Sequence, residues 1–183
     1  MTVRRRQCAG GILLGVLAFG ILQGILLAAL ACVLMLLTQA ARPHVAILGR
    51  IPGTQLYGDR ARHPENELIP GVLVFRPEGP LLYVGAESVE EVMLAAIAAA
   101  PFGSIRDAVC DLSAAPNMDF AGAQMLRRLN DAFAARGTAL RIVGAHGSVR
   151  DLLRRAGLLG VAGGIERGTS VESALAEIER ERA

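Results

Sequence analysis

The sequence has no tryptophan, no lysine and only three cysteines, Cys8, Cys32 and Cys110, in 183 residues. Three scattered cysteines are too few for a disulfide framework or a cysteine-rich site, so we predict no metal centre. Neither sign of charge dominates, because 19 basic residues, all of them arginine, stand against 17 acidic ones and the net charge is +2. A domain that grips nucleic acid electrostatically needs a larger basic excess, and we therefore expect no nucleic-acid partner.

Charged residues are also absent from the stretch Gly11–Leu37, in which Gln23 is the only strongly polar side chain. As a helix these 27 residues would reach about 40 Å, whereas the hydrocarbon core of a bilayer is about 30 Å thick. The run is therefore long enough for one tilted crossing and too short for two. Gly20, Gln23 and Gly24 interrupt its middle, so a helix, a break and a second helix form the alternative arrangement.

A secretory signal peptide is the main alternative to a membrane helix, because Arg4, Arg5 and Arg6 precede the run. The run is longer than a typical signal-peptide core, however, and residues 38–42 make a weak cleavage site. We therefore predict that residues 1–40 form a transmembrane segment. The apolar run carries no Asp, Glu, Lys, Arg or His, and a single helix cannot enclose a substrate pathway, so we expect no transport by this chain alone.

Residues 41–69 contain prolines and glycines at short intervals, which disfavours long helices, and we expect them to form a junction. Within this junction, we expect Val45–Leu48 to form a short extended segment. From Pro70 onward, apolar runs of strand length alternate with helical patterns. Such alternation predicts an α/β domain over residues 70–183, with a mixed β-sheet covered by helices.

Strands of this domain are predicted from short apolar runs at 72–75, 81–84, 105–112 and 139–143. The first two are expected to pair as a hairpin, because Pro77–Pro80 between them is typical of a turn. The glycine-rich tract at 157–168 suggests loops around a short final strand.

Helices are predicted from capping signals and periodicity: from Ser88 to about Ala100, over 124–136, from Ser148, and from Thr169 to the end of the chain. The last of these helices carries a run of charges that suggests a solvated face. Its members are Glu177, Glu179, Arg180, Glu181 and Arg182.

Catalytic motifs are missing from the sequence. It has no G-x-S-x-G, no H-E-x-x-H and no C-x-x-C, and no G-K-[ST] follows the glycine tract. We therefore predict that the protein is not an enzyme, that it has no catalytic residues and that it binds no cofactor.

The stretch Asp111–Ala123 joins a predicted buried strand to a predicted helix. Asp119 is placed to cap that helix, because an aspartate side chain accepts hydrogen bonds from the free N–H groups of a first turn. A helix N-terminus at the edge of a sheet is also an exposed surface that can bind a partner or an anion. Asp119 therefore has a structural interpretation and a functional one.

This stretch resembles the STAS domain, the fold shared by anti-sigma-factor antagonists and the cytoplasmic tails of SulP-family sulfate permeases. The pattern D-L-S-x(4)-M-D-x-x-G carries the resemblance at Asp111, Leu112, Ser113, Met118, Asp119 and Gly122. In the soluble antagonists a phosphorylatable Ser or Thr stands two positions after the second Asp, where this chain has Ala121. The resemblance therefore implies a partner-interaction loop and helix N-terminus without a phosphoacceptor, formed by Ser113, Met118, Asp119, Phe120, Ala121 and Gly122.

The sequence is similar to the permease branch of this family over most of its length. The matching segments are Phe19–Leu26, Ala41–Thr54, His63–Glu65, Pro70–Arg76 and Pro80–Glu87. The resemblance implies the last membrane segment, the junction and the regulatory STAS domain of a SulP-type sulfate or anion transporter in a bacterial inner membrane, with the STAS domain in the cytoplasm. The implied partners are membrane lipid and a permease membrane domain or a second STAS domain. The alternative is a stand-alone, membrane-tethered STAS adaptor that recruits a cytoplasmic protein without transport.

Overall fold

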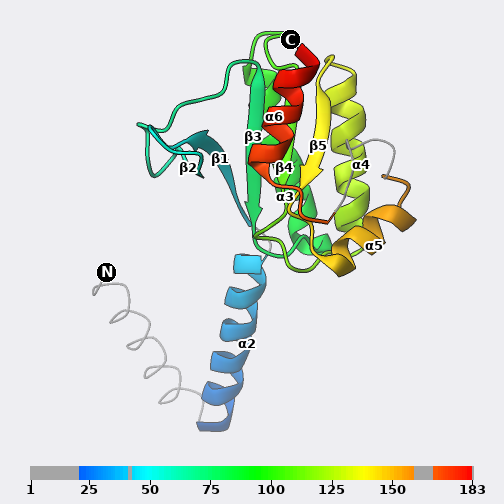
Figure 1. Ribbon diagram of the computed structural model, residues 1–183. Helices are drawn as coiled ribbons and strands as arrows, with labels where there is room; N and C mark the ends of the chain where they lie inside the picture. The colour runs from blue at the N-terminus through cyan, green and yellow to red at the C-terminus, as the bar shows by residue number, and fades with distance from the viewer. Residues whose placement is uncertain (1–20, 41–42, 159–166, 183) are drawn as a thin grey trace. The chain divides into compact units, whose positions relative to one another are not determined.

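Figure 1 shows the computed structural model, which describes residues 21–40, 43–158 and 167–182. The chain divides into two compact units, Met1–Ala40 and Ala41–Ala183. The described part of the first unit is helix α2, Ile21–Ala40, which exposes many large apolar side chains. In the described ranges, no helix is both long enough and apolar enough to cross a membrane. The transmembrane segment expected within residues 1–40 thus stays a prediction, and residues 11–20 of its apolar run lie outside the described residues.

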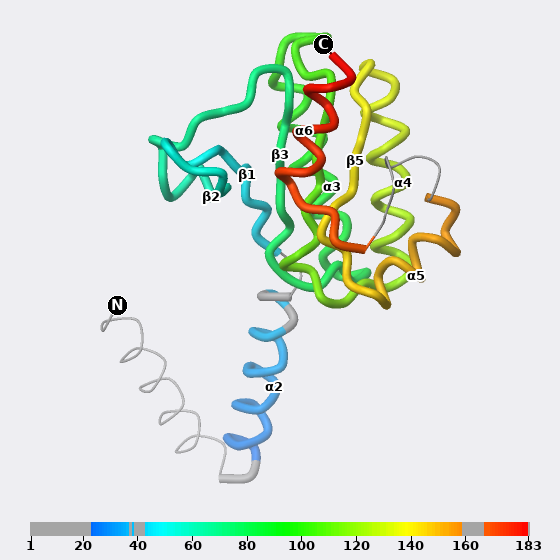
Figure 2. The backbone as a smooth tube through the Cα atoms, in the orientation of Figure 1, coloured from blue at the N-terminus to red at the C-terminus, as the bar shows by residue number. Residues whose placement is uncertain are grey.

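The second unit is built on a five-stranded sheet in the order β2-β1-β3-β4-β5 (Figure 1), and the path of the backbone through β2, β1, β3 and β5 can be followed in Figure 2. Its strands are β1 His44–Arg50, β2 Tyr57–Asp59, β3 Val72–Glu78, β4 Asp107–Asp111 and β5 Ala139–Val143. β1 pairs antiparallel with β2 and β3, whereas β3, β4 and β5 run parallel. The mixed sheet predicted from the alternation of apolar runs is therefore confirmed.

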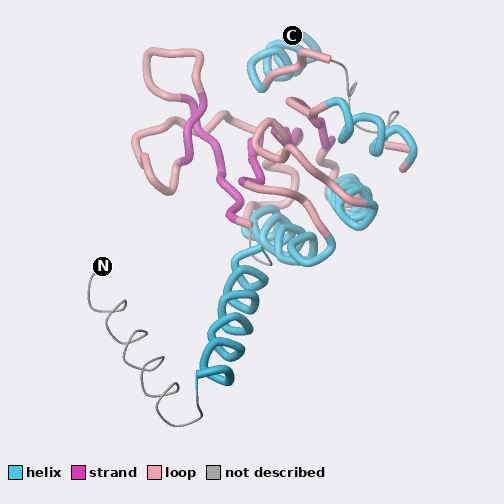
Figure 3. Tube along the Cα trace, turned by 90° about the horizontal axis from the view of Figure 1, so that it is seen from below, coloured by secondary structure: helices cyan, strands magenta, loops and turns pink. Residues whose placement is uncertain are grey.

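Helices cover both faces of this sheet. α3 Tyr83–Ala99, α4 Phe120–Ala134 and α5 Gly147–Arg155 pack on one face, and α6 Val171–Arg182 packs on the other. Figure 3 shows the strands between α6, which ends at the C-terminus, and helices α3 and α4. All five residues of β4 are buried, because this strand lies between two neighbours and under helices on both sides.

Alternation along the strands divides the apolar side chains between two cores. Phe75, Cys110 and Ile142 contribute to the core under α3 and α4, where Phe75 and Phe133 meet edge to face at 6.4 Å. Val74 and Val109 point to the opposite core, where they meet the apolar stripe of α6. That stripe contains Val171, Leu175 and Ile178, as its spacing in the sequence predicts.

The predicted hairpin is wrong. The segment expected to be its second strand, 81–84, contributes only an isolated bridge between Leu81 and Met118, and the chain turns into helix α3 at Tyr83. Ser88, predicted to cap this helix, lies inside it. A helix therefore follows β3 directly, as expected when the next strand, β4, is parallel to it.

The segment 41–69, expected to be a junction, contributes β1 and β2 to the sheet. β1 forms an antiparallel pair with β3 from His44 opposite Glu78 to Leu48 opposite Val74. Ala46 and Leu48 are fully buried in the core under α6. The compact unit accordingly begins at Ala41 rather than at Pro70.

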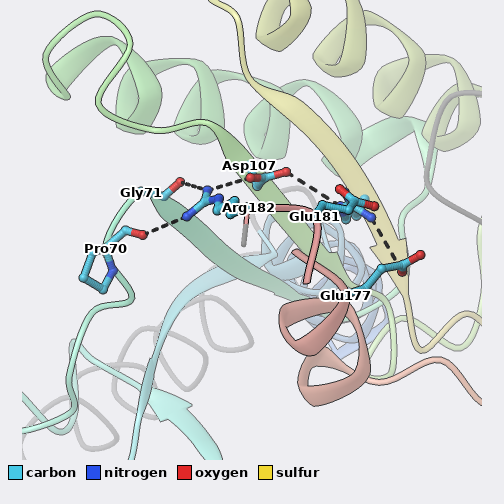
Figure 4. A network of polar contacts seen from close by, with 7 residues as sticks. Pro70, Gly71, Asp107, Glu177, Glu181 and Arg182 are labelled. Carbon is cyan, nitrogen blue, oxygen red and sulfur yellow. Dashed lines mark hydrogen bonds and ion pairs between the residues drawn. The ribbon is translucent and has the colours of Figure 1, made fainter. Parts of the chain in front are cut away.

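Charges on α6 tie this helix to the sheet (Figure 4). Arg182 donates to the carboxylate of Asp107 at 2.6 Å and to the carbonyl oxygens of Gly71 and Pro70 at 3.1 and 3.3 Å. Glu177 and Glu181 form ion pairs with Arg141, which projects from β5. Glu177, Glu181 and Arg182 are exposed, as predicted for a solvated face, but their partners come from strands that are distant in sequence.

The remaining helix starts differ from the predicted ones by one to four residues. α4 begins at Phe120, four residues before Gln124, with Asp119 as its cap. The cap position of α5 is His146, which precedes Ser148 by two residues. At the start of α6, Ser170 and Ser173 cap each other reciprocally, with backbone N–H to hydroxyl distances of 2.8 and 3.2 Å. The short final strand expected within the glycine tract falls mainly on 159–166, outside the described residues.

Candidate interaction surface

The predicted site residues lie at one edge of the sheet. β3, β4 and β5 are parallel, so their carboxyl ends meet at the same edge, and each is followed there by the N-terminus of a helix. β1 runs in the opposite direction and begins at this edge, with His44 opposite Glu78. In sheets of this kind the loops beyond the carboxyl ends of the strands form the usual binding surface.

Asp119 holds two helix N-termini at this edge. Its Oδ1 accepts the backbone N–H of Gly122 at 2.9 Å, which caps α4 as the sequence predicts. Its Oδ2 accepts the backbone N–H of Tyr83 at 2.8 Å, at the first residue of α3. Each bond satisfies an N–H group that has no partner within its own helix. One carboxylate therefore fixes the starts of α3 and α4, two of the helices that cover this face of the sheet.

Backbone contacts join the same two loops. Leu81 donates its N–H to the carbonyl oxygen of Asn117 at 2.9 Å and accepts the N–H of Asp119 at 3.2 Å. Gly122 packs so closely against this connection that a Cβ built on it would lie 2.3 Å from the oxygen of Leu81. Glycine at position 122 is therefore required by the approach of Leu81, which explains its place in the sequence pattern.

Ser113 lies on the β4–α4 loop and is exposed. Its backbone N–H is accepted by Oδ1 of Asp111 at 2.9 Å, at the end of β4. Gly144, at the end of β5, packs against this turn with a φ of 68°, and a Cβ there would lie 2.6 Å from the same oxygen. The predicted loop is therefore a tight structure held by neighbouring strand ends.

An open hollow of about 570 Å³ lies between the first turns of α3 and α4. It is lined by Tyr83, Val84, Ala86, Glu87, Glu90, Ala121, Gln124 and Arg128. Arg128 is engaged there by Glu90, with Nε 2.9 Å from Oε1 and 3.0 Å from Oε2. These hydrogen bonds raise the pKa of Arg128 and keep its charge directed at Glu90. The methyl group of Ala121 stands where a phosphoacceptor hydroxyl would face this hollow.

Of the predicted site residues, Met118 and Phe120 flank Asp119, and Phe120 is 61% exposed. Leu82, Tyr83 and Val84 are exposed at the start of α3, next to Asp119, and the sequence analysis does not include them among the site residues. It predicts a strand at these positions. The buried positions Ala86, Val89, Met93 and Ile97 follow helical spacing, and extending this spacing backward would have placed the start of the helix before Ser88. In the described ranges, no group of three or more His, Cys, Asp or Glu side chains could hold a metal ion.

Comparisons with known proteins identify relatives of this arrangement. The STAS domain family matches residues 63–174. The probable sulfate transporter Rv1739c of Mycobacterium tuberculosis is 28% identical over 144 residues, which are 79% of this chain and 26% of the transporter. The low affinity sulfate transporter 3 of Stylosanthes hamata is 34% identical over 142 residues, which are 73% of this chain and 22% of the transporter.

Solved structures with the same fold include a STAS domain of a SulP transporter from Vibrio cholerae. It is 29% identical, with a TM-score of 0.50, and the match covers 66% of this chain and 93% of that domain. The murine Slc26a9 anion transporter in the inward-facing state gives a TM-score of 0.72 at 16% identity, which shows likeness of fold, over 86% of this chain and 26% of the transporter. The chain thus spans about a quarter of the length of the transporters that it matches.

Proposed function

The chain belongs to the STAS domain family, whose match covers more than half of its length, and on that basis we propose that it is the regulatory C-terminal part of a SulP-type anion transporter. The extent of the similarity carries this proposal. The match to the mycobacterial transporter covers 144 residues, more than the STAS family match at 63–174, so it includes sequence outside that family match. Sequence shared with a transporter on the flanks of the family match supports a transporter origin.

In this proposal the apolar run Gly11–Leu37 anchors the chain in the membrane and the STAS domain lies in the cytoplasm. Support comes from the absence of charge in the run and from the exposed apolar side chains of α2. Removing such side chains from water is favourable by about 25 cal/mol per Å². Flotation with lipid vesicles tests the anchor: the chain is expected to move with the lipid, and recovery in the soluble fraction without detergent would contradict it.

The regulatory contact is assigned to the loop and helix N-terminus formed by Ser113, Met118, Asp119, Phe120, Ala121 and Gly122. A permease membrane domain or a second STAS domain is the expected protein partner. Because Ala121 has no hydroxyl, the contact is not controlled by phosphorylation at that position. The rigid backbone connections around Asp119 favour a surface that is permanently formed.

A complementation experiment tests this role. The chain is co-expressed with the membrane domain of a SulP transporter whose own STAS domain has been removed, and sulfate uptake is measured with and without the chain. We expect the chain to co-purify with the membrane domain and to change uptake, and Phe120→Asp to abolish both effects. Phe102→Asp is the control, since Phe102 is 76% exposed but lies in the turn before β4, at the opposite edge of the sheet.

Two results would argue against the regulatory role: uptake that is the same with and without the chain, or equal effects of the two Phe→Asp variants. The chain reconstituted alone is expected to move no sulfate, because one apolar run cannot form two gated halves around a substrate site. Uptake above that of empty vesicles would contradict this part of the proposal.

A further inference from the structure

Four apolar side chains stand exposed together at the carboxyl edge of the sheet. Leu82, Tyr83 and Val84 are 39%, 77% and 49% exposed at the start of α3, and Phe120 is 61% exposed at the start of α4. We call these four residues the apolar tip. Asp119 links the two helix starts, because it accepts the N–H of Tyr83 and directly precedes Phe120. The tip is therefore one connected surface on a fixed framework.

Charged side chains begin about one turn farther along α3 and two turns farther along α4. On α3, Glu87 and Glu91 are exposed after the tip, and on α4, Arg127 and Arg128 follow Phe120. The exposed surface thus changes from apolar at the tip to charged within about 5 Å along α3 and about 10 Å along α4. A shallow apolar layer below a charged one is the profile of a protein surface that sits in a lipid interface, where Tyr and other amphipathic rings are favoured.

Several backbone N–H groups near the tip are hydrogen-bonded within the protein. The N–H groups of Tyr83 and Gly122 are bonded to Asp119, and those of Gly85 and Ala86 are bonded to the carbonyl oxygen of Leu82. Burying a backbone N–H group without a hydrogen-bond partner in an apolar medium is unfavourable. Because their partners are internal, these four N–H groups can leave water without that cost.

The chain enters the STAS unit at the same edge. Pro43, which leads into β1, lies beside the β3–α3 turn: a Cβ built on Gly79 would stand 3.9 Å from the Cβ of Pro43. From Gly79 to Leu82 the chain can extend at most about 11 Å. The first residue of the tip is therefore close to the point where the segment from the apolar run arrives.

The connection from the apolar run to Pro43 is short. Leu37, the last residue of the run, precedes Pro43 by six positions, three of them within α2. Those six positions cover at most about 15 Å, from the helical rise for three and full extension for three. The headgroup region on each side of a bilayer is about 5–8 Å thick, so an anchored chain keeps this edge of the sheet near the lipid interface.

We propose that the apolar tip inserts into the lipid interface of the bilayer that holds the apolar run. This inference rests on the proposed membrane anchor and adds a second contact of the STAS domain with the same membrane. Lipid is favoured over a protein occupant of the tip by the short connection and by the change from apolar to charged surface along both helices. Phe120, at the border of the tip and the interaction loop, then contacts lipid, and the loop around Ser113 contacts the protein partner. The contact holds the domain with its carboxyl edge toward the membrane, where the interaction loop faces any membrane-embedded partner.

The sequence contains no tryptophan, so a single introduced tryptophan is the only indole fluorophore in the chain and reports on its own surroundings. The full chain is reconstituted into vesicles as the variant Phe120→Trp, and its fluorescence is compared in ordinary lipid and in lipid brominated on the acyl chains near the headgroups. Tyr83→Trp is a second reporter at the tip. The matched control is Phe102→Trp, a more exposed phenylalanine that packs under Arg136 in the turn before β4, at the other edge of the sheet. Circular dichroism checks that each variant is folded.

We expect brominated lipid to quench both tip reporters several-fold and to leave the control unchanged. If the chain does not float with vesicles, the proposed anchor fails and the inference falls with it. If the chain floats but the tip reporters are quenched no more than the control, the anchor stands and the inference is overturned. A tip reporter that is blue-shifted yet unquenched would also overturn it, because a second copy of the chain would then cover the tip.

Discussion

Oδ2 of Asp119 accepts a hydrogen bond from the backbone N–H of Tyr83, 36 positions earlier in the chain, at 2.8 Å. The other oxygen of the same carboxylate caps the helix that Asp119 itself precedes. Asp119 thus makes a long-range connection as well as a local one. The sequence motif predicts only the cap of α4, whereas Asp119 caps α3 as well. The same residue also lies in the candidate interaction surface.

Replacing Asp119 by Ala removes both caps. Loss of a capping side chain costs about 1 kcal/mol, so we expect Asp119→Ala to lower the free energy of unfolding of residues 41–183 by about 2 kcal/mol. Ser88→Ala is the control, because Ser88 lies inside α3 and alanine is the better helix former there, by up to about 0.5 kcal/mol. Urea denaturation measures both. Equal destabilisation by the two variants would mean that Asp119 is not a double cap.

Close packing at Gly122 leads to a second prediction. In Gly122→Ala the new methyl group would meet the backbone oxygen of Leu81, so the loop must move, and overpacking of this kind costs about 1–3 kcal/mol. Gly147, at the start of α5, is a matched control because a Cβ there would meet only the end of the Arg150 side chain, at 3.8 Å. We expect Gly147→Ala to be neutral or stabilising in thermal melts. A Gly122→Ala protein as stable as the original would show that Leu81 does not restrict this position.

Sequence patterns predicted the elements whose signals are local. β5 was predicted with its observed bounds, and the inner stripe of α6 and the cap of α4 follow from residues within one helical turn. The start of α3 could not be predicted in the same way, because its capping group comes from Asp119 after an intervening strand. Leu81 to Val84 form a short apolar run, and such a run is compatible with a strand or a helix until its partners are known.

Two further features were missed by the sequence analysis for the same reason, because their partners are distant in the sequence. β1 belongs to the sheet through antiparallel pairing with β3, between segments separated by about twenty to thirty residues, and nothing in its own composition marks that pairing. The charges of α6 look solvated in the sequence because their partners, Asp107 and Arg141, lie on β4 and β5. The interaction site on the β4–α4 loop stays a prediction, and the structure adds the exposed residues Leu82, Tyr83 and Val84 of α3 beside it.

Pairing of β1 with β3 predicts where a stable fragment begins. A fragment of residues 41–183 keeps the whole sheet and is expected to unfold cooperatively. A fragment of residues 70–183 loses Ala46 and Leu48 from the core under α6 and leaves one side of β3 unpaired. Burial of one Leu side chain contributes about 1.5–3 kcal/mol, so we expect the shorter fragment to be less stable by at least that amount. Chemical denaturation of the two fragments compares them, and equal stability would contradict the structural role of β1.

The network around Arg182 predicts that the last turn of α6 contributes to stability. Arg182 donates to the carboxylate of Asp107, a residue that is only 8% exposed. It also donates to two backbone oxygens of the segment before β3. In Arg182→Ala these acceptors lose their charged donor, and the hydrogen bonds of charged groups contribute about 1.5–3 kcal/mol each when buried. The guanidinium of Arg182 is about one-third exposed, which reduces the effect through solvent screening, and we expect a loss of about 1–2 kcal/mol.

Arg180 provides the matched control for this prediction. It lies on the same turn of α6, and the contact described for it is a hydrogen bond to the carbonyl oxygen of Ala176 within the helix. Arg180→Ala is therefore expected to change the free energy of unfolding by less than about 0.5 kcal/mol, as is usual for a surface substitution. The double variant Asp107→Asn with Arg182→Ala completes a thermodynamic cycle, in which the two changes should not be additive because the residues share one ion pair. Additive effects, or equal effects of the two arginine variants, would mean that α6 is held by its apolar stripe alone.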